Sequence, residues 1–157
     1  MECIVVDIDG TVADLNHRRH LSKKGTLFFL NVDFDYPIHS VITIVQAIRD
    51  TGVKVIFLSG RDSFCRNDTE RWLAKHVGHY DALFMRRSGD KRPDNMVKQE
   101  LIRFVTNEYT PILMIDDRNS IVDLWISLGF PVWQTVPRER TRLEDGSEDT
   151  RYDHGDF

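Results

Sequence analysis

The sequence predicts an α/β fold: a Rossmann-like parallel sheet of about five strands with helices on both faces. Five short apolar runs rich in β-branched residues are typical of buried strands. Amphipathic segments of helical length separate most of these runs, and such alternation indicates parallel βαβ units. The chain has 157 residues and is 41% hydrophobic. One domain of this size can bury a core without disulfides or structural zinc.

The predicted strands and helices follow one another along the chain. Strands are expected at residues 3–6, 53–58, 82–85, 112–115 and 132–134. A first helix is expected at 40–51, because Val41, Val45 and Ile48 recur there at helical spacing. Three further helices are expected at 67–76, 94–106 and 119–128.

Two segments depart from this alternation. Residues 14–39 form a long connection between the first strand and the first helix, which is typical of a functional flap. Neither this flap nor the loop 86–93 is long enough to fold separately, so we expect a minimal cap consisting of the short flap. Residues 138–157 are charged and almost free of aliphatic side chains. We expect a solvated tail there, beyond one domain at 1–137.

Composition excludes several classes of protein. The formal net charge of −4 argues against a generally basic nucleic-acid coat. No apolar run approaches the ~20 residues of a membrane span, and the first residues lack the basic region of a signal peptide. Cys3 and Cys65 match no metal-ligand spacing. We therefore expect reduced thiols and a cytoplasmic protein without membrane contact.

Polar side chains gather where the predicted strands end, and this is the edge at which parallel α/β sheets bind ligands. The residues expected there are Asp7, Asp9, Thr11, Ser59, Gly60, Arg61, Asp94, Lys98, Asp116 and Asp117. Two carboxylates about 4 Å apart repel by roughly 4 kcal/mol at an effective dielectric constant near 20, so such a group requires a cation. Oxygen ligands without nearby Cys or paired His favour Mg²⁺.

Asp7 and Asp9 are suited to phosphoryl transfer. They are two residues apart at a strand end, so the pleat directs both to the same side. One can attack phosphorus and form an aspartyl-phosphate. The other can protonate the leaving group if neighbouring carboxylates raise its pKa. We expect the Thr11 hydroxyl to approach the phosphate, and Ser59 and Lys98 to bind its oxygens.

These motifs resemble those of the haloacid dehalogenase superfamily of phosphohydrolases. Its four motifs fall, in order, on the DxDGT segment at 7–11, on Ser59, on Lys98, and on the pair Asp116 and Asp117. The resemblance implies that Asp7 is the nucleophile and Asp9 the acid/base. It also implies that Mg²⁺ is held by Asp7, the Asp9 carbonyl and Asp116, with Asp117 assisting.

A closer similarity is to the 3′-phosphatase domains of bacteriophage polynucleotide kinase-phosphatases. It spans most of residues 3–134 and rests on SGRDS at 59–63, RPDNMVKQELI at 92–102 and IDDRNSIVDLWISLGFPVWQ at 115–134. This similarity suggests a phage protein in a bacterial host. The chain has no P-loop motif, so kinase activity is not implied.

The closer similarity adds substrate-binding residues. Those it implies are Arg18 in the flap, Gly60 and Arg61 in the SGR motif, and Asp94. The flap has no sequence anchor, so Arg19 is the alternative to Arg18.

An uncapped site suits a phosphate at the end of a large molecule. We expect Lys23, Lys24, Arg86 and Arg87 to lie outside the phosphate pocket, where a nucleic-acid strand could run, although scattered solubilising charge is the alternative. The favoured function is a Mg²⁺-dependent phosphatase acting on 3′-phosphorylated DNA or RNA ends. A separate kinase or ligase is an expected partner.

Two other functions remain open. A nucleotidase or other small-molecule phosphatase would use the same fold and the same motifs. A non-catalytic receiver-like domain also gathers aspartates and a lysine on a parallel sheet. Its paired acids, however, follow the first strand, whereas here Asp116 and Asp117 follow the fourth.

Overall fold

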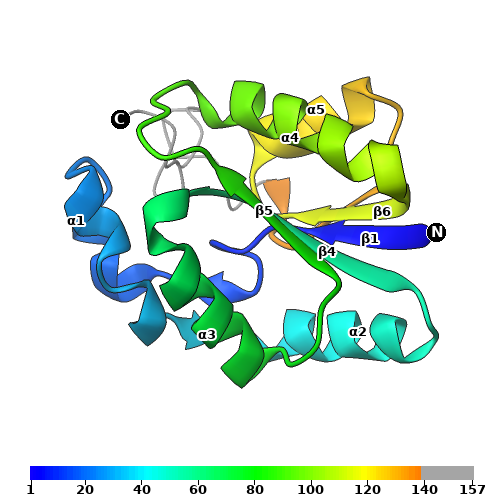
Figure 1. Cartoon of the computed structure of the whole chain (residues 1–157), viewed down its shortest axis with the longest axis horizontal. Coiled ribbons are helices and arrows are strands. Elements are labelled where there is room, and N and C mark those ends of the chain that lie inside the picture. Colours follow the sequence, from blue (N-terminus) through cyan, green and yellow to red (C-terminus); the bar gives the residue numbers. More distant parts are fainter. Residues whose placement is uncertain (139–157) are drawn as a thin grey trace.

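The computed structural model describes residues 1–138 and confirms the predicted parallel sheet (Figure 1). The sheet has five parallel strands in the order β5-β4-β1-β6-β7. The strands are β1 Glu2–Val6, β4 Lys54–Asp62, β5 Ala82–Arg86, β6 Thr110–Asp116 and β7 Val132–Gln134. β1 is therefore central, with β4 and β6 as its two neighbours.

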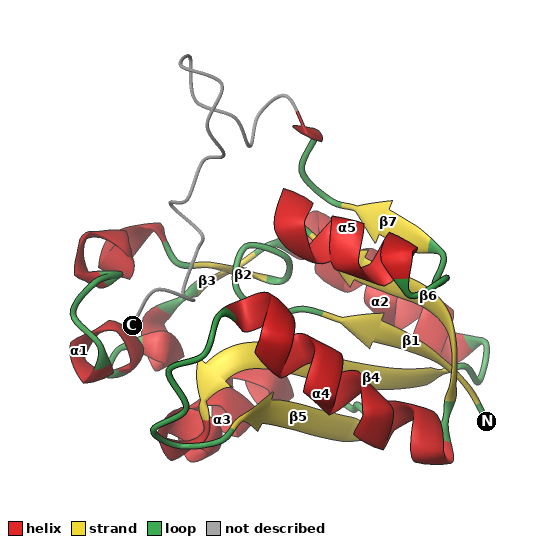
Figure 2. Cartoon of the chain, turned by 90° about the horizontal axis from the view of Figure 1, so that it is seen from above, coloured by secondary structure: helices red, strands yellow, loops and turns green. Residues whose placement is uncertain are grey.

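Four long helices cover the sheet, two on each face (Figures 1 and 2). One face carries α2 (His39–Asp50) and α3 (Arg66–His76). The other carries α4 (Asp94–Glu108) and α5 (Asn119–Ser127). All four predicted helices are confirmed, with ends shifted by at most two residues.

The alternation of side chains along β1 builds a core on each face. Ile4 and Val6 pack toward α2 and α3, whereas Cys3 and Val5 pack toward α4 and α5. All four are almost completely buried, which explains why this strand is apolar throughout. Cys3 and Cys65 are free thiols, as predicted, and burial raises the pKa of each to about 11.

The flap is short and compact. β2 (Ala13–Asp14) pairs with β3 (Tyr36–Pro37) and closes its base. Between them lie two 3-10 turns and the one-turn helix α1 (Thr26–Phe29). Flap residues pack on Cys65 and Met85 of the body to form a third small core. The flap is thus fixed to the domain and is not a separate cap.

Two expectations were wrong, one about the end of β4 and one about the position of Arg86. β4 was expected to end at residue 58, but it continues to Asp62 through an irregular pairing with β5. Ser59, Gly60 and Arg61 therefore lie within a strand. Arg86 was expected on a basic rim outside the phosphate pocket, but it is 1% exposed and donates to the Gly60 carbonyl (2.8 Å). Its guanidinium instead supports the loop that follows β5.

The predicted tail lies outside the described residues, except for residue 138. Along residues 1–138, no helix combines the length and the apolar character needed to cross a membrane.

The packing of α5 gives a test of this core. Ile121 is fully buried and Ile126, on the same helix, is 59% exposed. We expect Ile121→Ala to lower the free energy of unfolding by about 2–5 kcal/mol, because it leaves a cavity. The matched change Ile126→Ala is expected to stay within about 0.5 kcal/mol. Urea denaturation measures both, and equal losses would contradict the described orientation of α5.

Candidate active site

The fold brings the candidate residues to one edge of the sheet. β1, β4 and β6 are neighbours and parallel, so the residues at their carboxyl ends meet. Asp7 directly follows β1, and its backbone N–H donates to the Ile115 carbonyl of β6 (3.0 Å). Asp116 is the last residue of β6.

Asp7, Asp116 and Asp117 form a buried acidic cluster. Each offers a carboxylate oxygen, and these oxygens lie within 4.8 Å of one another. Lys98 reaches the cluster from α4, and its Nζ lies 2.8 Å from Asp7 Oδ1 and 2.9 Å from Asp116 Oδ2. One buried ammonium thus faces three buried carboxylates, and the cluster keeps an excess of negative charge.

Burial and repulsion shift the protonation of this acidic cluster. Burial, together with Asp116 and Asp117, raises the pKa of Asp7 well above its usual value, against the opposing effect of Lys98. Burial and Asp116 raise the pKa of Asp117 to about 7. Burial disfavours the charged form of Lys98, but Asp116 and Asp7 outweigh it and raise the pKa of Lys98. A hard divalent cation would relieve this repulsion, so the donor set fits Mg²⁺.

Two glycines permit close approaches at this edge. Gly10 has a φ of +82°, and a Cβ there would lie 2.3 Å from Asp117 Oδ2. A Cβ on Gly60 would lie 2.1 Å from Asp94 Oδ1. The Thr11 hydroxyl, which follows Gly10, donates to Asp117 Oδ1 (3.2 Å). Any larger residue at either glycine would displace a carboxylate of the site.

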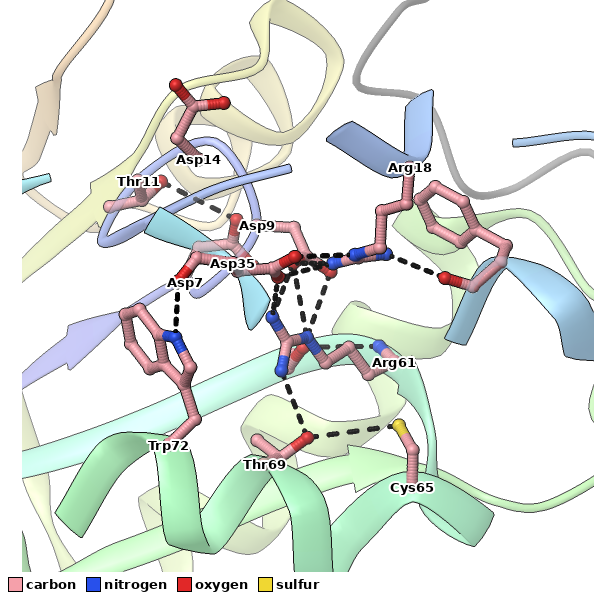
Figure 3. Close-up of polar contacts among 12 residues, drawn as sticks. Asp7, Asp9, Thr11, Asp14, Arg18, Asp35, Arg61, Cys65, Thr69 and Trp72 are labelled. Carbon is pink, nitrogen blue, oxygen red and sulfur yellow. Dashed lines mark hydrogen bonds and ion pairs between the residues drawn. The ribbon is translucent and has the colours of Figure 1, made fainter. Parts of the chain in front are cut away.

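Asp9 lies in a second, adjoining cluster (Figure 3). Its Oδ1 accepts from Nη2 of Arg18 and Nη2 of Arg61, both at 2.7 Å. Asp35 Oδ2 accepts from the same two nitrogen atoms, also at 2.7 Å. All four side chains are at most 4% exposed. Two carboxylates and two guanidiniums thus form a buried arginine–carboxylate cluster without net formal charge.

Sequence reasoning assigned no role to Asp35. It lies in the flap between Phe34 and Tyr36, both exposed, and nothing in this pattern indicates a buried carboxylate. Arg18 and Arg61 were expected to contact the substrate phosphate, so nothing in the sequence assigned them a second carboxylate partner.

The structure places Arg18, rather than Arg19, against Asp9, and this decides the register of the flap. Ser59 is buried in β4, and its Oγ accepts from the Arg61 backbone N–H (3.1 Å). These residues are close together, as expected from their motifs. Their individual roles in catalysis and substrate binding stay predictions.

Asp94 opens α4 as predicted and is also buried. It accepts from Nη2 of Arg86 (3.2 Å) and Nη2 of Arg118 (3.0 Å). Its Oδ2 lies 3.7 Å from Lys98 Nζ. Asp94 therefore links the acidic cluster to the loop that follows β5, and Gly60 makes room for it.

Comparison with known proteins identifies relatives of this chain. The family model for the polynucleotide kinase PNKP phosphatase domain matches residues 1–139. A protein of Autographa californica nuclear polyhedrosis virus, assigned as a bifunctional polynucleotide kinase/RNA ligase, is 31% identical over 140 residues. That alignment covers 87% of this chain but 19% of the relative. The chain thus spans about a fifth of that relative's length.

Solved structures give the same result. A chain of the Pnkp1/Rnl/Hen1 complex is 35% identical, with a TM-score of 0.76 over 86% of this chain and 46% of that one. The D,D-heptose 1,7-bisphosphate phosphatase of B. bronchiseptica, solved with magnesium and phosphate, is 16% identical (TM-score 0.60, covering 94% of this chain and 91% of that one). This second likeness shows the fold alone. Neither the matching family model nor these solved structures support the receiver-like alternative. The chain belongs to the family of polynucleotide kinase PNKP phosphatase domains, within the haloacid dehalogenase fold, and is a phosphatase.

Proposed function

We propose that this chain is a Mg²⁺-dependent polynucleotide 3′-phosphatase that acts through an aspartyl-phosphate. The observation that carries the proposal is the acidic cluster with Lys98, placed at the end of the central strand of a domain of this family. Asp7 is the only member of that cluster from the DxDGT motif, and it is the proposed nucleophile. Asp9, two residues on, is the proposed acid/base.

The reaction proceeds in two steps. An oxygen of the Asp7 carboxylate attacks phosphorus, the bond from phosphorus to the leaving oxygen breaks, and Asp9, which must enter this step in its protonated form, gives its proton to that oxygen. Water then attacks the phosphorus of the aspartyl-phosphate and gives a proton to the Asp9 carboxylate. The bond to Asp7 breaks and inorganic phosphate leaves. Lys98, Thr11 and Ser59 would bind the phosphoryl oxygens.

The acidic cluster would hold the metal ion. Asp7, Asp116 and Asp117, with the Asp9 carbonyl, are the proposed ligands, and bound Mg²⁺ would offset the charge of the phosphoryl group. Lys98, which contacts Asp7 and Asp116, would add a fixed positive charge near the phosphoryl group.

Arg18 and Arg61 were expected to bind the substrate phosphate. In the structure their nitrogen atoms are already engaged: Nη1 of Arg18 donates to the Phe28 carbonyl and Nη1 of Arg61 to the Thr69 hydroxyl. The remaining nitrogen atoms donate to carboxylates. We therefore assign them first to holding Asp9, and contact with a phosphate would require an exchange of these bonds.

A small cavity lies beside the flap. It has a volume of about 210 Å³ and opens between the flap and the loop that follows β5. Phe29, Phe64 and Lys91 line it together with Asp62, Asp90 and Arg86, and Arg86 also donates to Asp94. Aromatic and basic side chains together suit a nucleoside and its phosphate.

Relatives suggest the partners. One is assigned as a kinase and RNA ligase, and others belong to a complex with Rnl and Hen1. We propose that kinase and ligase activities act with this phosphatase on broken nucleic-acid ends in the cytoplasm. Whether they belong to one polypeptide or to several, removal of the 3′-phosphate would leave the hydroxyl that a ligase needs.

The nucleophile gives the first test of this function. Asp7→Asn removes the attacking charge and preserves the shape, so turnover should fall by about 10³-fold or more while the fold survives. Asp50→Asn, at an exposed carboxylate of α2, is the control and should retain full activity. Phosphate release and thermal unfolding are measured for both. Near wild-type turnover by Asp7→Asn would reject the aspartyl-phosphate.

The metal gives the second test. A chelator should abolish turnover without unfolding the protein, and Mg²⁺ should restore it. Asp116→Asn removes a direct ligand, so the Mg²⁺ concentration for half-maximal rate should rise by about tenfold or more. Asp123→Asn, on the exposed face of α5, serves as control. Activity that persists with the chelator would contradict a metal-dependent reaction.

The third test concerns the polynucleotide. Lys23, Lys24 and Arg87 are exposed on the two loops. Changing all three to alanine should lower kcat/KM for a 3′-phosphorylated oligonucleotide and reduce its salt dependence, by a slope of about 0.7 per lost phosphate contact. Turnover of 4-nitrophenyl phosphate should stay nearly constant.

Lys75→Ala combined with Arg103→Ala is the control for this rim, because both side chains are exposed in the second halves of α3 and α4, away from the carboxyl edge. Wild-type protein should prefer the oligonucleotide to a 3′-mononucleotide. Equal kcat/KM for the two at low salt would replace this proposal with the nucleotidase alternative.

A further inference from the structure

We propose that Phe64 is a substrate-binding residue whose ring stacks on the 3′-terminal nucleobase of the strand. The inference rests on the proposed function, because the proposed substrate is what brings a base to this edge of the sheet. Phe64 belongs to none of the four phosphatase motifs, and it follows Arg61 in the chain by three residues.

The backbone, rather than burial of the ring, fixes the position of Phe64. It lies in the 3-10 turn Ser63–Cys65, which directly follows β4. Its backbone N–H donates to Asp62 Oδ1 (2.9 Å), and Asp62 Oδ2 accepts from the backbone N–H of Gly89 (3.0 Å). Asp62 thus ties this turn to the loop that follows β5. Cys65 is 1% exposed and Phe64 is 43% exposed, so the turn buries a thiol and presents a phenyl ring to solvent.

A series of contacts links Phe64 to the buried arginine–carboxylate cluster. The Arg18 guanidinium lies over the Phe28 ring, 4.4 Å from its centroid. Phe28 meets Phe29 edge to face, with 5.1 Å between the ring centroids, and Phe29 meets Phe64 in the same way at 6.0 Å. Phe28 and Phe29 are buried. Phe64 is therefore the exposed end of a series that begins beside Asp9.

The contact with Phe29 leaves the Phe64 ring able to receive a base. One edge-to-face contact uses either the edge of the Phe64 ring or one of its faces, so it covers at most one face. Stacking needs a flat, exposed surface of this kind, and it accepts any base because every base has a π face. Buried Phe29 supports the ring from the body of the flap, so stacking would order few additional side-chain atoms.

The small cavity beside the flap adjoins this ring and suits a neutral ligand. Phe64 lines it together with two carboxylates and two cations, namely Asp62, Asp90, Arg86 and Lys91. The formal charges of these four side chains cancel, so the cavity favours a neutral base over a second phosphate. The exposed cations of the two loops remain available for the phosphates of the strand.

A strand without its terminal base tests this contact. The two substrates are a 3′-phosphorylated oligonucleotide and the same strand with an abasic tetrahydrofuran unit at its 3′ end. We expect wild-type kcat/KM to be about tenfold higher for the complete strand. Phe64→Ala should lower kcat/KM for the complete strand by about tenfold, and should leave the abasic strand and 4-nitrophenyl phosphate within about twofold. A general loss of structure would instead lower all three.

Phe104→Ala is the matched control. Phe104 is 51% exposed and lies in the second half of α4, away from the carboxyl edge. This variant should keep the wild-type preference for the complete strand. Phe64→Trp should also keep it, because a larger ring can stack in the same place.

Phe64→Leu keeps the inference testable if Phe64→Ala does not fold. Leucine retains apolar packing against Phe29 but offers no flat ring, so most of the preference for the complete strand should be lost. A preference that persists in either variant, or equal losses on the complete and abasic strands, would overturn the inference.

The same substrates separate this inference from the proposed function. If wild-type protein hydrolyses both strands equally, and both better than a 3′-mononucleotide, the polynucleotide function stands and the assignment of Phe64 is wrong. If it hydrolyses 4-nitrophenyl phosphate but neither strand, the polynucleotide function fails and the inference fails with it.

Discussion

Buried charge must be paired, and this constraint organises the carboxyl edge of the sheet. Among residues 1–138, six buried carboxylates face four buried cations. Arg18 and Arg61 balance Asp9 and Asp35, and Arg86 pairs with Asp94. The remaining two negative charges belong to the acidic cluster, where Lys98 is the single buried cation. One divalent ion would complete the balance at the place where the proposed chemistry occurs.

The division into two clusters also separates two chemical tasks. The nucleophile must be an ionised carboxylate near a phosphate, and Asp7 lies beside two other carboxylates and the Lys98 ammonium. The acid/base must be held at a fixed distance from the leaving oxygen, and Asp9 lies between two planar guanidiniums. A single intervening residue, Ile8, suffices, because Gly10 turns the backbone directly afterwards.

Most of this edge could be predicted from the sequence, because its residues follow strands whose apolar runs are unmistakable. Asp7 and Asp116 were located by that rule, and Lys98 was located on the helix predicted before the fourth strand. Asp35 and Arg86 were not, because their burial depends on how a flap and a loop fold back on the body. Periodicity carries no information about such tertiary packing, and charged side chains in connections are ordinarily solvated.

The central position of β1 has a consequence for the assembly of the protein. Its second neighbour, β6, is made of residues 110–116, so the first strand cannot complete its pairing until most of the domain has been synthesised. Such non-local parallel pairing is slow, and an unpaired apolar strand favours aggregation in the meantime. The ion pair between Asp7 and Lys98 spans 91 positions. Catalytic competence should therefore arise late, in one cooperative event, and nascent chains that end before β6 would depend on chaperones.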